Sequence, residues 1–308
     1  MSDAATEVRE FRIDIPEGEI IDLKSRLAST RWPDAETPDD WSQGLPLEYH
    51  QEFCKYWETE YDWYKTQEKL NKFPQFKSRF DGIDIHFVHV RSKENNARPL
   101  IITHGWPGSI VEFQKVIAPL TDPVGHGGKP EDAFHVVCPS LPGFGFSDKP
   151  TGTGWGVIKI AEVWNQLMLR LGYDRYFAQG GDWGSAVTTM IGLQNLGNCK
   201  GLHVNMPSSP PTKEALKNPD DKDKKAFAAG QFYQQWDSGY SKQQATRPQT
   251  LGYGLSDSPS GQAGWVLEKF YAWTDCNGHP ENVISRDELL DNIMLYWLPN
   301  NGASSARL

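Results

Sequence analysis

One short segment of the sequence carries residues whose types and spacing could do covalent chemistry. Residues 180–185 read GGDWGS, follow a strand-like run and precede a helical pattern. Small residues on both sides of a reactive one are typical of a nucleophile elbow, a strained turn that lifts one side chain above a sheet. The lifted residue here is Asp182, so the sequence predicts a carboxylate nucleophile.

A carboxylate is ionised at neutral pH and needs no base to become nucleophilic. It attacks esters poorly, but it can displace a strained or good leaving group from a saturated carbon. The segment therefore predicts an epoxide or an alkyl halide as substrate, and an alkyl ester of Asp182 as intermediate.

Breaking that ester requires hydrogen-bond donors for the charge that develops on its carbonyl oxygen. Residues 104–108, HGWPG, follow an earlier strand-like run, where such donors belong. The backbone N–H groups of Trp106 and Trp183 are the predicted oxyanion-hole donors, because the residue after the nucleophile and one in the earlier loop normally converge. Alone, HGWPG would indicate a structural turn and Asp182 a helix N-cap; together and in this order they favour catalysis.

The elements that must position these residues form an α/β pattern. From Pro99 onward, short apolar runs each end in a turn rich in small residues, and a helical pattern over 155–172 separates the second run from the third. Strand, helix and strand at this spacing predict a parallel sheet covered by helices, with reactive groups at the carboxyl ends of its strands.

The flanking parts of the chain read differently. The first quarter contains amphipathic helical segments, including one face formed by Ile20, Leu23 and Leu27, and Asp81-Gly82 marks a hairpin between two strand-like runs. After Met206 the strand signals stop, and helices are predicted around 226–240, 264–274 and 286–298. A helical insertion at this place predicts a lid over a pocket.

The composition excludes several classes of protein. The chain has 308 residues with 31 Lys+Arg against 40 Asp+Glu, a formal charge of −9, which argues against partners such as nucleic acid or anionic lipid. No apolar run is long enough to span a bilayer, the start lacks the features of a secretory signal, and the 4 cysteines form no CxxC pair. These features predict a cytoplasmic protein.

Several segments together resemble the microsomal-type epoxide hydrolases of the α/β-hydrolase fold. The matching segments occur in the family's order and cover essentially the whole chain: FRIDIPEGEIIDLKSRLASTRWPD, HGWPGS, PSLPGFGFSDKP, QGGDWGS, GLHVNM, TRPQTLGYGLSDSPSGQAGWVLEKF and NIMLYW. The resemblance implies hydrolysis of a small apolar epoxide to a vicinal diol through an ester of Asp182, without metal or cofactor. It also implies a place in aromatic hydrocarbon catabolism or detoxification.

The resemblance divides the chain into three parts. It implies an N-terminal segment with the first strands over residues 9–115, an α/β-hydrolase core over 98–206 and a helical cap over 207–300. In this family two tyrosines of the cap polarise and protonate the epoxide oxygen. Tyr240 is similar to the first of them, because it stands eight residues before the proline of Thr-Arg-Pro.

The same family pattern bears on the other tyrosines and on the histidines. Tyr253, Tyr271 and Tyr296 are alternative positions for the acid. The family places a general base, a histidine, and its orienting carboxylate after the cap, but none of the 8 histidines follows a late strand: His50, His86, His89, His104, His126, His135, His203 and His279. The sequence therefore predicts a C-terminally incomplete member that lacks the last core strands and the second tyrosine, and that forms the ester without completing turnover.

Two alternatives remain open at this point. A haloalkane dehalogenase also uses an aspartate at the elbow, and Trp183 would then bind the departing halide. A non-catalytic binding protein on a degenerate hydrolase scaffold would explain the missing histidine. The HGWPGS segment and the N-terminal segment favour the epoxide interpretation, and Tyr240 separates the two enzymes because a dehalogenase has no use for it.

Overall fold

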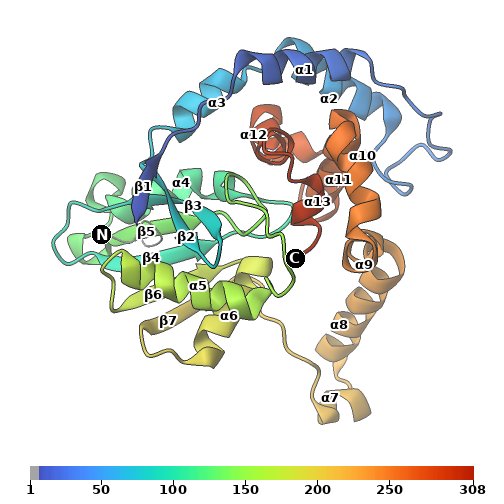
Figure 1. The fold of residues 1–308 in the computed structure, drawn as a ribbon. Coiled ribbons are helices and arrows are strands. Elements are labelled where there is room, and N and C mark those ends of the chain that lie inside the picture. Colours follow the sequence, from blue (N-terminus) through green and yellow to red (C-terminus); the bar gives the residue numbers. More distant parts are fainter. Residues whose placement is uncertain (1–6) are drawn as a thin grey trace.

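The computed structural model describes residues 7–308, which form one mixed sheet covered by helices on both faces (Figure 1). The sheet has 7 strands in the order β1-β2-β3-β5-β4-β6-β7. The strands are β1 (Val8–Phe11), β2 (Gln75–Phe80), β3 (Ile83–Val90), β4 (Arg98–Thr103), β5 (Phe134–Pro139), β6 (Tyr176–Gly180) and β7 (Cys199–Val204).

The helices fall into an N-terminal group, a central group and a C-terminal group. The N-terminal group is α1 (Glu17–Ala28), α2 (Leu47–Thr59) and α3 (Trp63–Leu70), and the central group is α4 (Gln114–Thr121), α5 (Val157–Arg170) and α6 (Trp183–Gln194). The C-terminal group is α7 (Lys213–Lys217), α8 (Asp221–Phe232), α9 (Gly239–Thr246), α10 (Pro248–Asp257), α11 (Pro259–Ala272), α12 (Arg286–Trp297) and α13 (Gly302–Ser305). In the part of the chain that is described, no helix is long and apolar enough to cross a membrane.

The predicted hairpin is confirmed. Strands β2 and β3 pair antiparallel, with Phe80 opposite Ile83, and the two residues between them have positive φ angles, 45° at Asp81 and 90° at Gly82. Such turns match the natural twist of the two strands, which explains why Asp-Gly is found here.

The predicted parallel sheet is confirmed as well. Strands β4, β5, β6 and β7 run parallel, and Thr103 at the end of β4 lies beside Gly180 at the end of β6. Residues 104–109 and the elbow at 180–185 therefore leave neighbouring strands at the same edge of the sheet. This juxtaposition positions the candidate site.

Neighbouring residues of the central strands point to opposite cores, so these strands are apolar on both faces. Ile101 packs in the core formed with α5 and α6, whereas Ile102 packs in the core formed with α4 and the N- and C-terminal helices. Within the described residues, β7 is the outer parallel strand, and Leu202 on it is 47% exposed.

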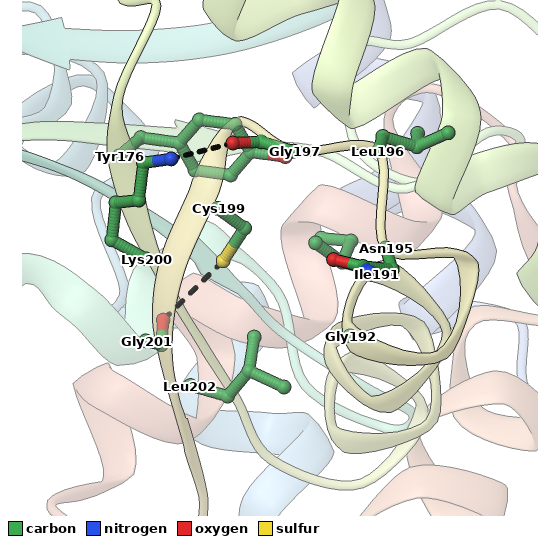
Figure 2. A pocket seen from close by; sticks show the side chains of 10 residues that line it. All are labelled: Tyr176, Ile191, Gly192, Asn195, Leu196, Gly197, Cys199, Lys200, Gly201 and Leu202. Carbon is green, nitrogen blue, oxygen red and sulfur yellow. Dashed lines mark hydrogen bonds between the residues drawn. The ribbon is translucent and has the colours of Figure 1, made fainter.

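A small hollow lies between β7 and α6 (Figure 2). Its volume is about 220 Å³, and Tyr176, Ile191 and Leu202 are among the residues that line it. Tyr176 begins β6, whereas Asp182 follows its end. The hollow therefore lies at the opposite end of β6 from the elbow.

The N-terminal helices arch over one side of the sheet and meet the C-terminal helices (Figure 1). Helix α1 contacts α11, and α3 contacts α12. Leu23 and Leu27 of the predicted α1 face are buried, and Ile20 is half-buried. The N-terminal segment thus connects parts of the chain that are more than two hundred residues apart, as the hydrogen bond from Tyr61 to Asp291 shows.

The predicted cap helices need correction. A single helix over 226–240 is wrong, because α8 ends at Phe232, a π-helical turn η4 (Tyr233–Asp237) follows, and α9 begins at Gly239. Residues 248–257 form α10, which the sequence did not predict, since Gly252 and Gly254 weaken its helical pattern. Gly252 packs against Ala303, where a larger side chain would overlap it.

Two leucines of α5, one buried and one exposed, give a direct test of the core packing. Leu167 of α5 is fully buried, while Leu169 on the same helix is 43% exposed. We expect Leu167→Ala to lower the free energy of unfolding by about 2–5 kcal/mol and Leu169→Ala to change it by less than about 0.5 kcal/mol, both measured by urea denaturation. Equal losses for the two variants would contradict the assignment of the core.

Candidate active site

The elbow places Asp182 on a strained backbone between β6 and α6. Its φ is 52° and its ψ is −124°, a conformation that residues other than glycine rarely adopt. A Cβ atom at Gly180 would overlap the carbonyl of Gly184, and one at Gly184 would overlap the carbonyl of Thr103. The elbow therefore requires both glycines, because β4, β6 and α6 come into backbone contact here.

The carboxylate of Asp182 is held by the loop that follows β4. The backbone N–H of Trp106 donates to Oδ1 of Asp182 at 2.8 Å. Burial raises the pKa of Asp182, and the N–H groups of Trp106 and Trp183 oppose this by stabilising the ionised form. The structure thus brings together Asp182, Trp106 and Trp183, which the sequence singled out.

The loop of residues 104–109, here called the oxyanion loop, is positioned by its own histidine. His104 is buried, and its Nε2 accepts from the backbone N–H of Leu141 at 3.1 Å. The proton must then be on Nδ1, which donates to the carbonyl of Gly105 at 2.9 Å. That carbonyl shares a peptide plane with the N–H of Trp106, so His104 helps to direct this donor toward Asp182.

Gly105 itself leaves room for the carboxylate of Asp182. A Cβ atom at this position would overlap the carboxylate of Asp182, and a Cβ at Gly108 would overlap the carboxyl of Glu112. Surrounding protein and the charge on Asp182 raise the pKa of Glu112 to about 7, although part of its surface is exposed to solvent. Glu112 is a group near the site that sequence reasoning missed; it stands only three residues after the HGWPGS segment.

Tyr240 lies over the same tryptophan that binds Asp182. Its ring stacks on that of Trp106 with centroids 5.0 Å apart and an angle of 8° between the planes. The hydroxyl of Tyr240 is 3.2 Å from that of Tyr233. Burial is the main cause that raises the pKa of Tyr240, and the neighbouring hydroxyl adds to it, so the phenol stays protonated at neutral pH.

Tyr233 was not predicted as part of the site. It stands seven residues before Tyr240, a spacing of two helical turns that could have identified it. Lys269 also contacts Tyr240, with Nζ 4.8 Å from the ring centroid and 2.8 Å from Oδ1 of Asp237. The position of Tyr240 is therefore fixed by three neighbouring side chains.

Comparison with known proteins matches this site to a family. The family described as epoxide hydrolase N terminus matches residues 8–113, and that described as α/β hydrolase fold matches residues 98–236. A Stigmatella aurantiaca protein, provisionally named an epoxide hydrolase, is 52% identical over 301 residues, covering 98% of this chain and 68% of that protein. Epoxide hydrolase 1 of Oryctolagus cuniculus is 36% identical over 325 residues, covering 97% of this chain and 71% of that protein.

The chain belongs to the epoxide hydrolase family. Its fold is the α/β-hydrolase fold, and the structure of Aspergillus niger epoxide hydrolase superimposes on it with a TM-score of 0.87 at 30% identity, covering 99% of this chain and 79% of that chain. The predicted family and fold class are confirmed. The predicted division into N-terminal segment, core and cap stays a prediction.

The other tyrosines weighed for the acid lie in different surroundings from Tyr240. Tyr253 is 70% exposed, and Tyr271 stacks on Trp41 with centroids 3.9 Å apart. The hydroxyl of Tyr296 donates to the carbonyl of Gly108 at 2.6 Å. Of the four tyrosines considered for the acid, Tyr240 alone stacks on the oxyanion loop in the described chain.

No hydrogen bond joins a histidine of the described chain to Asp182. His86 binds Ser140 and Gln75 through its two ring nitrogens, each at 2.9 Å, and His50 binds the carbonyl of Ser260 at 2.8 Å. Burial lowers the pKa of His86 to about 3 and that of His104 to about 4. Both are neutral structural groups at pH 7. Within residues 7–308, no cluster of His, Cys, Asp and Glu is arranged to hold a metal ion.

A large cavity adjoins the site on the side of the cap. It has a volume of about 1390 Å³ and lies between residues 30–50 and the helices α9 and α11. Seven aromatic side chains contribute to its wall: Trp32, Trp41, Phe232, Trp236, Tyr240, Trp265 and Tyr271. Because Tyr240 belongs both to this wall and to the candidate site, an apolar molecule in the cavity would lie next to Tyr240.

The neutral state of His104 predicts that the free energy of unfolding depends on pH differently in the wild type and in a variant without this histidine. An unfolded histidine titrates near pH 6.5, so the stabilisation by neutral His104 is present above this pH and is lost as the pH falls toward 4. We expect the free energy of unfolding to fall by about 1 kcal/mol more in the wild type than in His104→Gln between about pH 7 and pH 5.5. Urea denaturation at both pH values measures this, and parallel changes in the two proteins would contradict it.

Proposed function

We propose that this chain opens a small apolar epoxide by attack of Asp182 and carries the nucleophile, the oxyanion hole and one acid of epoxide hydrolysis to a vicinal diol. One observation carries the proposal: the N–H of Trp106 holds Asp182 at the elbow while Tyr240 stacks on the same Trp106. Nucleophile, oxyanion donor and acid thus meet around one side chain.

The first step uses the two oxygens of Asp182 differently. Oδ1 is engaged by the N–H of Trp106, which leaves Oδ2 to attack an epoxide carbon. As the new C–O bond forms, the strained C–O bond breaks and its electron pair moves to the epoxide oxygen, which takes the proton of Tyr240. The neighbouring hydroxyl of Tyr233 can donate to the resulting phenolate.

The second step is the hydrolysis of the ester. Water attacks Cγ of Asp182, and the carbonyl oxygen that becomes negative is Oδ1, which already accepts from Trp106. Cleavage of the bond between Cγ and Oδ2 returns the carboxylate and releases the diol. Of the two protons of water, one goes to the departing alkoxide and the other, by way of solvent, restores the phenol of Tyr240.

Several observations support an epoxide over an alkyl halide. A departing halide needs N–H donors and no proton, whereas a departing alkoxide needs an acid, and Tyr240 provides a neutral hydroxyl. The relatives described above are named epoxide hydrolases. Release of bromide from a bromoalkane at a rate comparable with epoxide opening would favour the dehalogenase alternative.

The surroundings of the site favour an apolar substrate. The aromatic wall of the adjoining cavity can bury an alkyl or aryl group next to Tyr240. A cytoplasmic location is part of the proposal, and the 4 free cysteines fit a reducing compartment.

The nucleophile is tested with styrene oxide as probe. We expect the wild type to give a covalent adduct one epoxide heavier in intact-mass spectra after acid quench, and Asp182→Asn to give none, because the amide is not nucleophilic. A matched control is Asp257→Asn on α10, whose carboxylate is exposed; it should form the adduct like the wild type. Adduct formation in Asp182→Asn, or its absence in the wild type, would sink the proposal.

The acid is tested by removing one hydroxyl. We expect Tyr240→Phe to slow alkylation of Asp182 by a factor of roughly 10²–10⁴, the usual contribution of a general acid. Tyr253→Phe removes the hydroxyl of an exposed cap tyrosine and should leave the rate unchanged. Single-turnover mass spectrometry measures both, and a wild-type rate in Tyr240→Phe would contradict the assignment.

A further inference from the structure

Helix α12 donates two side-chain hydrogen bonds to the oxyanion loop. Nδ2 of Asn292 donates to the carbonyl of Pro107 at 2.7 Å, and the hydroxyl of Tyr296 donates to the carbonyl of Gly108 at 2.6 Å. Asn292 and Tyr296 are four residues apart, so they share one face of α12. Two consecutive carbonyls of the loop are thus held by one helix face.

Asn292 makes a second contact with the same loop. Its Oδ1 accepts from the hydroxyl of Ser109 at 2.8 Å, so the amide spans the loop on both sides of Gly108. Ser109, Asn292 and Tyr296 are all buried, with exposed fractions of 2%, 4% and 3%. Water is therefore not at hand to replace these bonds, and each lost partner leaves a buried polar group unpaired.

Another face of α12 is anchored to the N-terminal segment. Oδ1 of Asp291 accepts from the hydroxyl of Tyr61 at 2.8 Å and also from that of Thr66. Trp57 packs in the same core as Met294, and its indole N–H points to the sulfur at 3.3 Å. The helix that contacts the oxyanion loop is thus itself fixed by α2 and α3.

The oxyanion loop depends on such contacts because it follows the end of β4 and has no strand partner. Trp106 stands directly before Pro107, and its N–H is the donor to Asp182. Rotation of the peptide planes at Pro107 or Gly108 would displace Trp106. Side-chain donors on those carbonyls restrict this rotation.

We infer that Asn292 and Tyr296 are positioning residues of the oxyanion hole: by holding the carbonyls of Pro107 and Gly108, α12 fixes the N–H of Trp106 on Asp182. The inference rests on the proposed roles of Asp182 and Trp106. It assigns Tyr296 to loop geometry and leaves proton transfer to Tyr240.

A loosened loop should change how Asp182 titrates. The N–H of Trp106 lowers the pKa of this carboxyl, so a weaker bond moves the acid limb of the alkylation rate to higher pH. The other titratable groups near Asp182 are Glu112 beside the loop, Tyr240 of α9 and Tyr296 itself. Tyr296 is neutral, so its replacement by Phe leaves every charge in place.

The test compares Tyr296→Phe and Asn292→Ala with the wild type in the full chain. With styrene oxide as probe, we expect alkylation at pH 7 to slow roughly tenfold in each variant, with the acid limb displaced upward by about half a pH unit. Hydrogen exchange of the peptide covering residues 104–110 should become faster in both variants. This second readout does not require any reaction.

Tyr61→Phe is the matched control. It also removes a buried tyrosine hydroxyl that binds α12, but the partner of this hydroxyl is Asp291 and not the oxyanion loop, and Asp291 keeps its bond from Thr66. We expect a loss of stability in this variant with wild-type exchange over 104–110 and a wild-type pH profile. Unchanged exchange in Tyr296→Phe and Asn292→Ala, or equal acceleration in Tyr61→Phe, would overturn the inference. Absence of alkylation in the wild type would refute the proposed function instead, and the exchange data would still decide the role of α12.

Discussion

The hydrogen bond from the N–H of Trp106 to Oδ1 of Asp182, 2.8 Å long, is the interaction on which the rest of the site depends. It joins two loops that leave neighbouring parallel strands, and it requires those loops to approach at backbone distance. Gly105 and Gly184 are where they do so, since a Cβ at either position would overlap the opposite loop. An ionised carboxylate in a mostly buried place needs such donors, because burial alone would favour its protonated form.

Each further layer of the structure restricts this bond. The register of β4 and β6 places Thr103 beside Gly180 and so sets the starting points of both loops. His104 directs the peptide plane of Trp106 from inside the loop, and Tyr240 covers the Trp106 ring from the cap. Behind the loop, α12 connects it to the N-terminal helices.

The sequence predicted the parts of the site that depend on local spacing. Gly residues flanking Asp182 and the HGWPG segment are sufficient to predict the elbow and the donor loop, because close backbone approach admits few other residues. The Asp81-Gly82 turn was predictable for the same reason. The break between α8 and α9 was not predictable, since it depends on the π-helical turn around Tyr233. Helix α10 was not predictable either, because its two glycines lower its helix propensity and packing on α13 stabilises it.

Contacts between distant segments were also beyond sequence reasoning. The sequence makes Tyr296 an alternative candidate for the acid, because tyrosines can transfer protons. In the structure its hydroxyl instead donates a hydrogen bond to the carbonyl of Gly108. The pairing of Tyr61 with Asp291 results from tertiary packing that no spacing in the sequence indicates.

Peptide mapping by tandem mass spectrometry after brief exposure to styrene oxide tests the central claim most directly. The account predicts that the epoxide carbon is attached to the carboxylate of Asp182 in the peptide that contains residues 180–185. Attachment to another group, in particular to the neighbouring carboxyl of Glu112, with Asp182 unmodified, would contradict it.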